Sequence, residues 1–250
     1  MKAILQTILA VALLAQQPRT LELRRFEVIR VNPDELRRLP SQMRGFFGDP
    51  LLDGELAGSI DEAAKRVGFT PRLLNGKKPE RVFVSREANE EIKVDAAALT
   101  TALGEAKVSN VTVPANWDGT VIRLQQRPGV VIDYGDFYVA QSAPATLVVP
   151  DGFSFDQCLE MMFRVMGVSS SDARSLREQF AANPTVFVPI AKRFDMDIHQ
   201  VPLTGGSGLL LQNADKGGEL AFMWSSADRS YFLTGLLKED EAIAVARSLQ

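Results

Sequence analysis

The sequence predicts an α+β protein in which an antiparallel sheet, a meander followed by a C-terminal hairpin, carries helices packed on one face. The first observation is a series of short runs rich in Val, Ile, Tyr and Phe between residues 111 and 149, punctuated by Pro, Gly, Asn and Asp. The second is a pair of apolar segments at residues 219–235, separated by a polar turn. The third is a set of helical segments that open with Ser or Asp caps.

Residues 1–18 are predicted to be a signal peptide or a signal-anchor. Lys2 precedes an uncharged run over residues 3–15, in which Ala10-Val11-Ala12 fits the small-x-small pattern of a signal-peptidase site. As a helix this run would span only about 20 Å, whereas the hydrocarbon core of a bilayer measures about 30 Å. We therefore expect export with cleavage near Ala12 or Ala15. The alternatives are a signal-anchor that associates with the membrane through residues 3–15, and an amphipathic or buried first helix.

Residues 19–58 are predicted to be a connector, because three prolines interrupt a charged stretch that has room for one strand or short helix. A first α+β sub-region follows over residues 59–150. It opens with the capping box Ser59-x-x-Glu62 and a helix that ends at Gly68. Strands are expected at 81–85 and 91–94, and a helix capped by Asp95 is expected to stop at Gly104. The meander is expected at 111–114, 120–125, 130–134, 137–141 and 145–150.

A second α+β sub-region is predicted over residues 151–250. Ser154-x-x-Gln157 and Ser169-x-x-Asp172 each predict the start of a helix, and Gly167 separates the two. Strands are expected at 185–189, 197–201 and 209–211, before the closing hairpin. The last helix begins in the acidic residues 239–241 and places Ala242, Ile243, Ala246 and Leu249 at helical spacing. Trp224 and Tyr231 are expected on the hairpin, with Trp224 buried beneath this helix.

The strongest pattern for a catalytic or metal site is Asp195, Asp197 and His199 in the segment FDMDIH. On a strand, spacing at every second residue would place two carboxylates and the only imidazole on one face. A metal- or serine-dependent hydrolase that uses this face is therefore one functional alternative. The favoured interpretation is a solvent-facing strand side opposite Phe194, Met196 and Ile198, because the same alternation would produce it. We accordingly predict no catalytic residue, no metal site and no cofactor.

Other motifs favour structural roles. The single cysteine, Cys158, lies in an apolar run and is expected to be a small core residue. The methionines and phenylalanines around it, at helical spacing, are expected to form core in preference to an adaptable ligand face. The glycine-rich segment 205–208 is predicted to be a turn between strands, because neither a Lys-Ser/Thr pair nor a helix follows it. A formal net charge of −3 gives no general attraction to nucleic acid.

The closing segment resembles a bacterial domain family of unknown function that forms the extracytoplasmic C-terminal part of membrane-anchored proteins similar to anti-sigma factors. In that family a strand ends in Trp, a polar turn leads to an aromatic strand ending in Thr-Gly, and a helix finishes in Ala-x-Ser-Leu. The corresponding residues are Met223-Trp224, Ser225 to Arg229, Tyr231 to Gly235, and Ala246 to Leu249, and the resemblance extends back to about Ser59. Two departures are the absence of the family's tryptophan near Pro184 and Lys238 in place of a capping Ser or Thr.

The resemblance implies an extracytoplasmic, non-enzymatic sensor or binding domain whose partner is a protein or an apolar ligand. One cysteine excludes the His-x-x-x-Cys-x-x-Cys zinc module of anti-sigma factors from this chain, because that site needs two. A lipid-handling or structural protein of the envelope is the remaining alternative.

Overall fold

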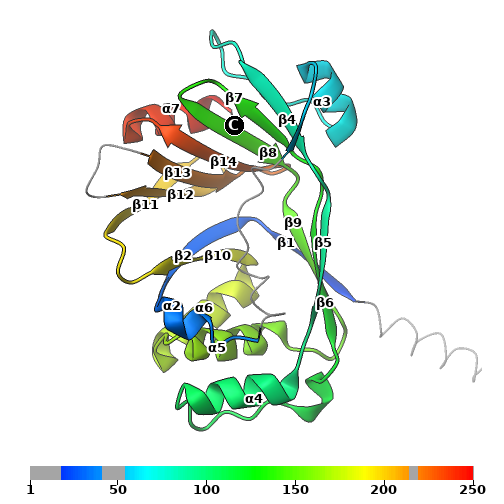
Figure 1. The fold of residues 1–250 in the computed structure, drawn as a ribbon, viewed down its shortest axis with the longest axis vertical. Helices are drawn as coiled ribbons and strands as arrows, with labels where there is room; N and C mark the ends of the chain where they lie inside the picture. Colours follow the sequence, from blue (N-terminus) through cyan, green and yellow to red (C-terminus); the bar gives the residue numbers. More distant parts are fainter. Residues whose placement is uncertain (1–17, 41–53, 214–218, 250) are drawn as a thin grey trace, which may run out of the picture.

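The computed structural model describes residues 18–40, 54–213 and 219–249, and there it confirms an α+β fold of mostly antiparallel sheet. Three pairs of consecutive strands run along the molecule and form its frame (Figure 1). They are β4 (Arg81–Ser85) with β5 (Ala88–Lys93), β6 (Val121–Gln126) with β7 (Val130–Asp133), and β8 (Phe137–Ser142) with β9 (Ala145–Val149). In each pair one strand belongs to an eight-stranded sheet and the other to a four-stranded sheet. The chain bends between the two.

The eight-stranded sheet has the order β11-β12-β13-β14-β8-β7-β4-β3, and the four-stranded sheet has the order β1-β9-β6-β5. All of their neighbouring strands are antiparallel. The other strands of these two sheets are β1 (Arg19–Leu23), β3 (Gly54–Leu56), β11 (Met196–Leu203), β12 (Gly206–Asn213), β13 (Glu219–Ser225) and β14 (Ser230–Leu236). The closing hairpin, β13 and β14, therefore lies in the middle of the larger sheet.

Two helices cover one face of the eight-stranded sheet, α3 (Ile60–Val67) and α7 (Glu239–Ser248). Trp224, Phe222, Tyr231 and Leu233 of the closing hairpin are buried in the core on that face, with Ala242, Ala246 and Leu249 from the C-terminal helix region. This confirms the predicted packing of the last helix on the hairpin. Ser59 caps α3 by accepting a bond from the Glu62 amide at 3.1 Å, and Gly68 ends it with φ of 77°.

The four-stranded sheet packs on a second group of helices, α4 (Ala96–Glu105), α5 (Phe155–Val165) and α6 (Ser170–Ala182). Their shared core includes Ile92, Ile122 and Leu147 from the sheet and seven buried residues of α5. Ser169 caps α6 as predicted, whereas the Ser154 side chain makes no cap bond at the start of α5. Gly104 does not stop α4, which continues to Glu105.

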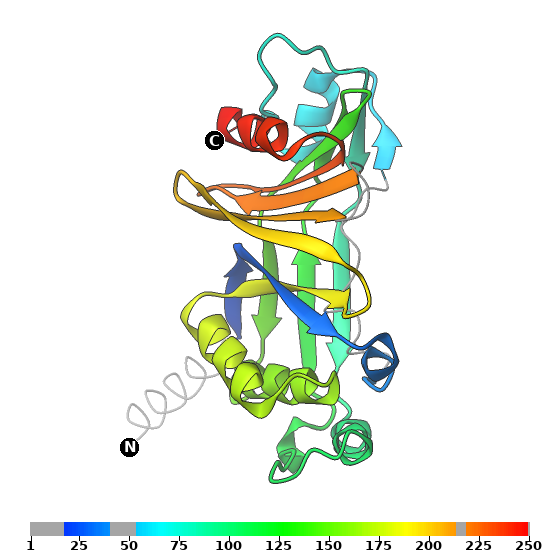
Figure 2. The ribbon, with the colours of Figure 1, turned by 90° about the vertical axis from the view of Figure 1, so that its left-hand side faces the viewer.

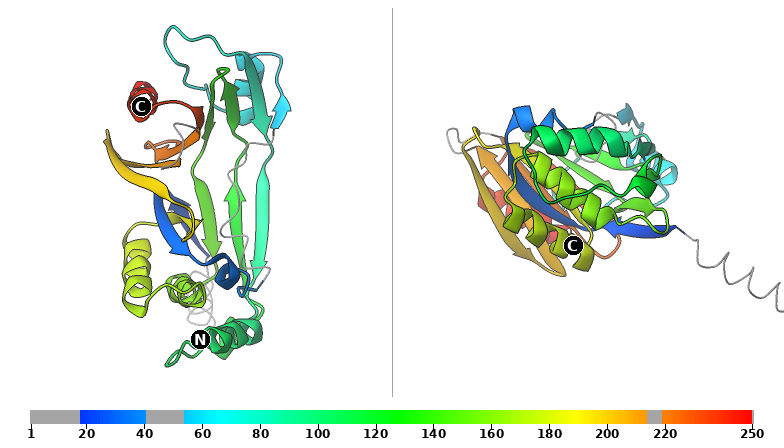
Figure 3. Two further views of the ribbon diagram at one scale, coloured as in Figure 1. Left: turned by 60° about the vertical axis from the view of Figure 1, so that its left-hand side comes forward. Right: turned by 90° about the horizontal axis from the view of Figure 1, so that it is seen from below.

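A parallel two-stranded ribbon lies between these two halves (Figure 2). It consists of β2 (Arg25–Val31), which leads into the short helix α2 (Pro33–Leu36), and β10 (Thr185–Ala191). One face of the ribbon packs on the eight-stranded sheet, where Ile190 meets Leu209, Leu211 and Met223. The other face packs on α5 and α6, where the Phe187 ring lies 4.8 Å from the Phe163 ring. Figure 3 shows the ribbon and these helices on the same side of the bent strands.

Several sequence predictions need correction. Residues 19–58 were predicted to be a connector. Instead, β1 pairs with β9 and β2 pairs with β10, so this segment joins both halves of the fold. Residues 111–114 are not a strand and lead into a short 3-10 helix, Ala115–Trp117. The sub-regions predicted over 59–150 and 151–250 contribute strands to the same eight-stranded sheet. The predictions for the N-terminal signal lie outside the described residues, apart from residue 18.

No helix among residues 18–40, 54–213 and 219–249 is long and apolar enough to cross a membrane.

Candidate ligand-binding site

The Asp195, Asp197 and His199 side chains are all exposed and do not form a metal-binding group. Asp195 precedes β11, whereas Asp197 and His199 lie on it and alternate with Met196 and Ile198. The last two pack against the core between the ribbon and the sheet. Among the described residues, no group of three or more His, Cys, Asp or Glu side chains is placed to hold a metal ion. The alternation on β11 thus separates a solvent side from a packed side, but Phe194, predicted on the packed side, lies before the strand and is exposed.

The remaining motifs also have structural positions. Cys158 is fully buried in α5, and burial raises the pKa of its thiol to about 12, so the thiolate form that nucleophilic chemistry requires is strongly disfavoured. Phe155, Met161 and Phe163 on the same helix are buried with it in the core. Gly205, with φ of 84°, lies in the tight turn between β11 and β12. The following residues, Gly206 to Gly208, already belong to β12.

A cavity of about 480 Å³ lies where the strands bend from one sheet into the other. The inner face of the bent strands forms one wall, the ribbon and helices α5 and α6 form the opposite wall, and β12 to β14 close one end. The apolar part of its described lining consists chiefly of Leu23, Phe26, Leu124, Val130, Val131, Leu147, Phe155, Leu159, Phe180, Val186, Phe187, Val188, Leu211, Met223 and Phe232. Protein interiors seldom contain voids much larger than a water molecule, so a space of this size is a distinct structural feature.

Small side chains at the bend leave this space open. The bent strands contribute Ala88, Gly129, Ala140 and Ala145 to the lining, and β13 contributes Ala221. Gly129 has a second reason to be small, because a Cβ atom there would lie 2.8 Å from the Gln141 carbonyl oxygen. The Ser85 hydroxyl accepts a bond of 2.8 Å from the Gly129 amide, which holds two neighbouring strands together at the bend.

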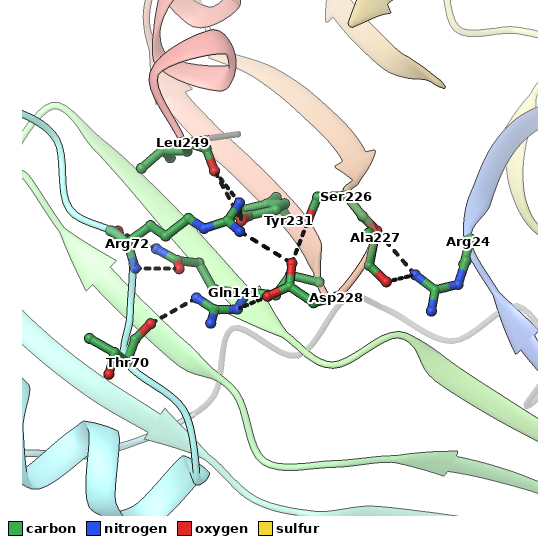
Figure 4. Close-up of polar contacts among 10 residues, drawn as sticks. Arg24, Thr70, Arg72, Gln141, Ser226, Ala227, Asp228, Tyr231 and Leu249 are labelled. Carbon is green, nitrogen blue, oxygen red and sulfur yellow. Dashed lines mark hydrogen bonds and ion pairs between the residues drawn. The ribbon is translucent and has the colours of Figure 1, made fainter. Parts of the chain in front are cut away.

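Gln141 and Tyr231, two buried polar residues of the cavity lining, form hydrogen bonds with other groups of the protein (Figure 4). The Gln141 amide group accepts from the Arg72 backbone N–H at 2.9 Å and donates to the Arg72 carbonyl at 2.6 Å. The Arg72 guanidinium donates to the Tyr231 hydroxyl and to the Leu249 carbonyl, each at 2.8 Å, and forms an ion pair with Asp228. This network ties the loop after α3 to the end of α7.

Other polar lining groups bond to protein in the same way. The Thr185 hydroxyl donates to the Asn183 carbonyl at 2.7 Å, and the Gln126 amide donates to the carbonyls of Arg127 and Ala143. Arg24 fixes the end of the hairpin beside the cavity by donating to the carbonyls of Ser226 and Ala227 (Figure 4). The cavity therefore presents mainly hydrocarbon, and its described lining contains neither a His nor a Cys that could act as base or nucleophile.

Comparison of the chain with protein-family models, with curated proteins and with solved structures found no match. The resemblance to the extracytoplasmic family therefore stays a prediction. The cavity was not predicted from the sequence, because its lining comes from segments between residues 23 and 232. The one local signal was the occurrence of Ala, Gly and Ser within strand segments of the meander, and small residues in strands also have purely structural uses.

Proposed function

We propose that this protein is a non-enzymatic binding domain that takes up a small apolar molecule in the cavity at the strand bend. The observation that carries the proposal is the combination of volume and lining. Ligand pockets usually enclose about 300–1,000 Å³ and are lined mainly by apolar side chains with few polar groups. The cavity has a volume of about 480 Å³. The buried polar groups named above form hydrogen bonds with other protein groups.

The driving force for uptake is the removal of apolar surface from water, at about 25 cal/mol per Å² of buried area. A dry or poorly hydrated cavity favours this further, because little ordered water must be displaced. The predicted export signal makes the extracytoplasmic space the proposed place of binding, and the resemblance makes a sensor the proposed context. A lipid-handling envelope protein would use the same cavity.

Uptake is tested with N-phenyl-1-naphthylamine, an uncharged apolar dye that fluoresces when it leaves water. We expect wild-type protein to bind one dye molecule per chain. Ala140→Leu places a larger side chain in the cavity, and we expect it to weaken dye binding at least about tenfold, equivalent to about 1.4 kcal/mol. Ala181→Leu makes the same change at an exposed position of α6 and should bind like wild type.

A larger side chain in a packed region can destabilise a fold by about 1–3 kcal/mol. Circular dichroism must therefore show that Ala140→Leu is folded, and Ala221→Leu, on β13 two strands away from β8 in the same sheet, serves as a second filling variant. Wild-type protein that binds no dye, or folded filling variants that bind it as well as wild type does, would refute the proposal. A cavity already filled by part of this chain would give the first of these results.

A further inference from the structure

The cavity has one charged side chain in its described lining, Glu90 on β5. Residues 88, 90 and 92 share a face of this strand, because side chains alternate along it. Ala88 lines the cavity and Ile92 is buried in the core below it, so this face points inward. Glu90 is also the lining residue that is exposed to solvent. Its carboxylate therefore marks the place where the cavity reaches water.

Two arginines near Glu90, on the neighbouring strand and before β5, form ion pairs with other carboxylates. Arg123 on the neighbouring strand bonds to Glu91 at 2.9 Å, and Arg86 before β5 bonds to Glu55 at 3.1 Å. None of the ion pairs within residues 18–40, 54–213 and 219–249 includes Glu90. The described lining also contains no Lys, Arg or His. The mouth thus offers negative charge to whatever enters, with apolar walls behind it.

We infer that the ligand is a cationic amphiphile, in which an aliphatic chain fills the cavity and an ammonium group lies at Glu90. This inference rests on the proposed function and names the chemical class of its ligand. The ammonium group keeps contact with water at the exposed mouth, so it binds the carboxylate without the cost of burying a charge. A fatty acid, with its carboxylate at the same place, is disfavoured by repulsion.

The charge preference is tested with three probes of equal chain length: decylammonium, decanol and decanoate. Their dissociation constants are measured by calorimetry at low salt and below the concentrations at which they form micelles. We expect decylammonium to bind about two- to fivefold more tightly than decanol, and decanoate to bind more weakly than decanol by a similar factor, as for exposed ion pairs. The difference should shrink in 1 M salt, where the Debye length falls to about 3 Å.

Glu90→Gln keeps the shape of the side chain and removes its charge. We expect this variant to bind decanol as wild type does and to lose the preference for decylammonium. Glu87→Gln, a matched change at an exposed residue outside the lining, should keep the preference. Equal binding of the three probes by wild type, or a preference that survives in Glu90→Gln, would overturn the inference while leaving the proposed function intact. Failure of all three probes to bind would contradict both the inferred ligand class and the proposed function.

Discussion

At the scale of single residues, Trp224 shows how an aromatic side chain organises the larger sheet. Its indole is fully buried and stacks on the Tyr231 ring, with centroids 4.9 Å apart and planes 3° from parallel. The Phe222 ring lies 5.1 Å away on the same strand. Among the described residues, the indole Nε1–H has no hydrogen-bond partner. The contribution of Trp224 to stability therefore comes from packing.

We predict that Trp224→Ala lowers the free energy of unfolding by about 3–5 kcal/mol, as for other large aromatic residues truncated in a core. Trp224→Phe should cost clearly less, because it keeps the stacking with Tyr231 and gives up no indole hydrogen bond. Urea denaturation followed by circular dichroism measures both values. A change in the free energy of unfolding within about 0.5 kcal/mol for Trp224→Ala, as at a surface position, would show that the residue is not a packing centre.

At the scale of elements, the bends decide where the cavity lies. In each strand pair of the frame, two or three residues separate the strand in one sheet from the strand in the other. Gly129 lies in one of these bends, close to Gln141 and Ser142. A Cβ atom at position 129 would meet the Gln141 carbonyl oxygen at 2.8 Å and the Ser142 Cβ at 3.0 Å. These are backbone and near-backbone atoms, which cannot rotate away.

We predict that Gly129→Ala destabilises the protein by about 1–3 kcal/mol, the usual cost of overpacking. Gly104→Ala is the matched control, because a Cβ there meets nothing within 4 Å. Gly104 lies in the last turn of α4 without a positive φ, so Ala, which has the higher helix propensity, should stabilise there by up to about 0.5–1 kcal/mol. Thermal unfolding of the two variants should therefore shift in opposite directions. A melting temperature of Gly129→Ala equal to or above that of wild type would mean that the bend tolerates a side chain and is less constrained than its contacts indicate.

The same bends mark the limit of prediction from the sequence. Helix caps at Ser59 and Ser169 and the closing hairpin were predicted correctly, because each depends on residues within about one turn or one strand. Pro128-Gly129 and Pro144 were interpreted as breaks between successive meander strands. They are bends within a frame strand that continues into the other sheet. Pro and Gly interrupt the ladder in both cases, and only the pairing of distant strands distinguishes the two.

At the scale of the molecule, the two sheets and the ribbon are interdependent. The core on the four-stranded sheet contains residues from Leu23 to Phe187, and the eight-stranded sheet joins β11 to β14 from the C-terminal part of the chain to β8, β7, β4 and β3 from the preceding part. The cavity arises where these parts meet, from small residues on the frame and large ones on the ribbon and helices. No local segment contains that arrangement, so the sequence predicted the fold class and not the site.

A crystal structure of the protein with decylammonium would show directly whether the cavity holds the apolar chain of a cationic amphiphile. We expect electron density for the decyl chain between the bent strands and the ribbon, close to Leu124, Phe155 and Phe187, with the nitrogen within hydrogen-bond distance of the Glu90 carboxylate. Density for the probe only on the outer surface, or side chains of the protein itself filling the cavity, would contradict this expectation.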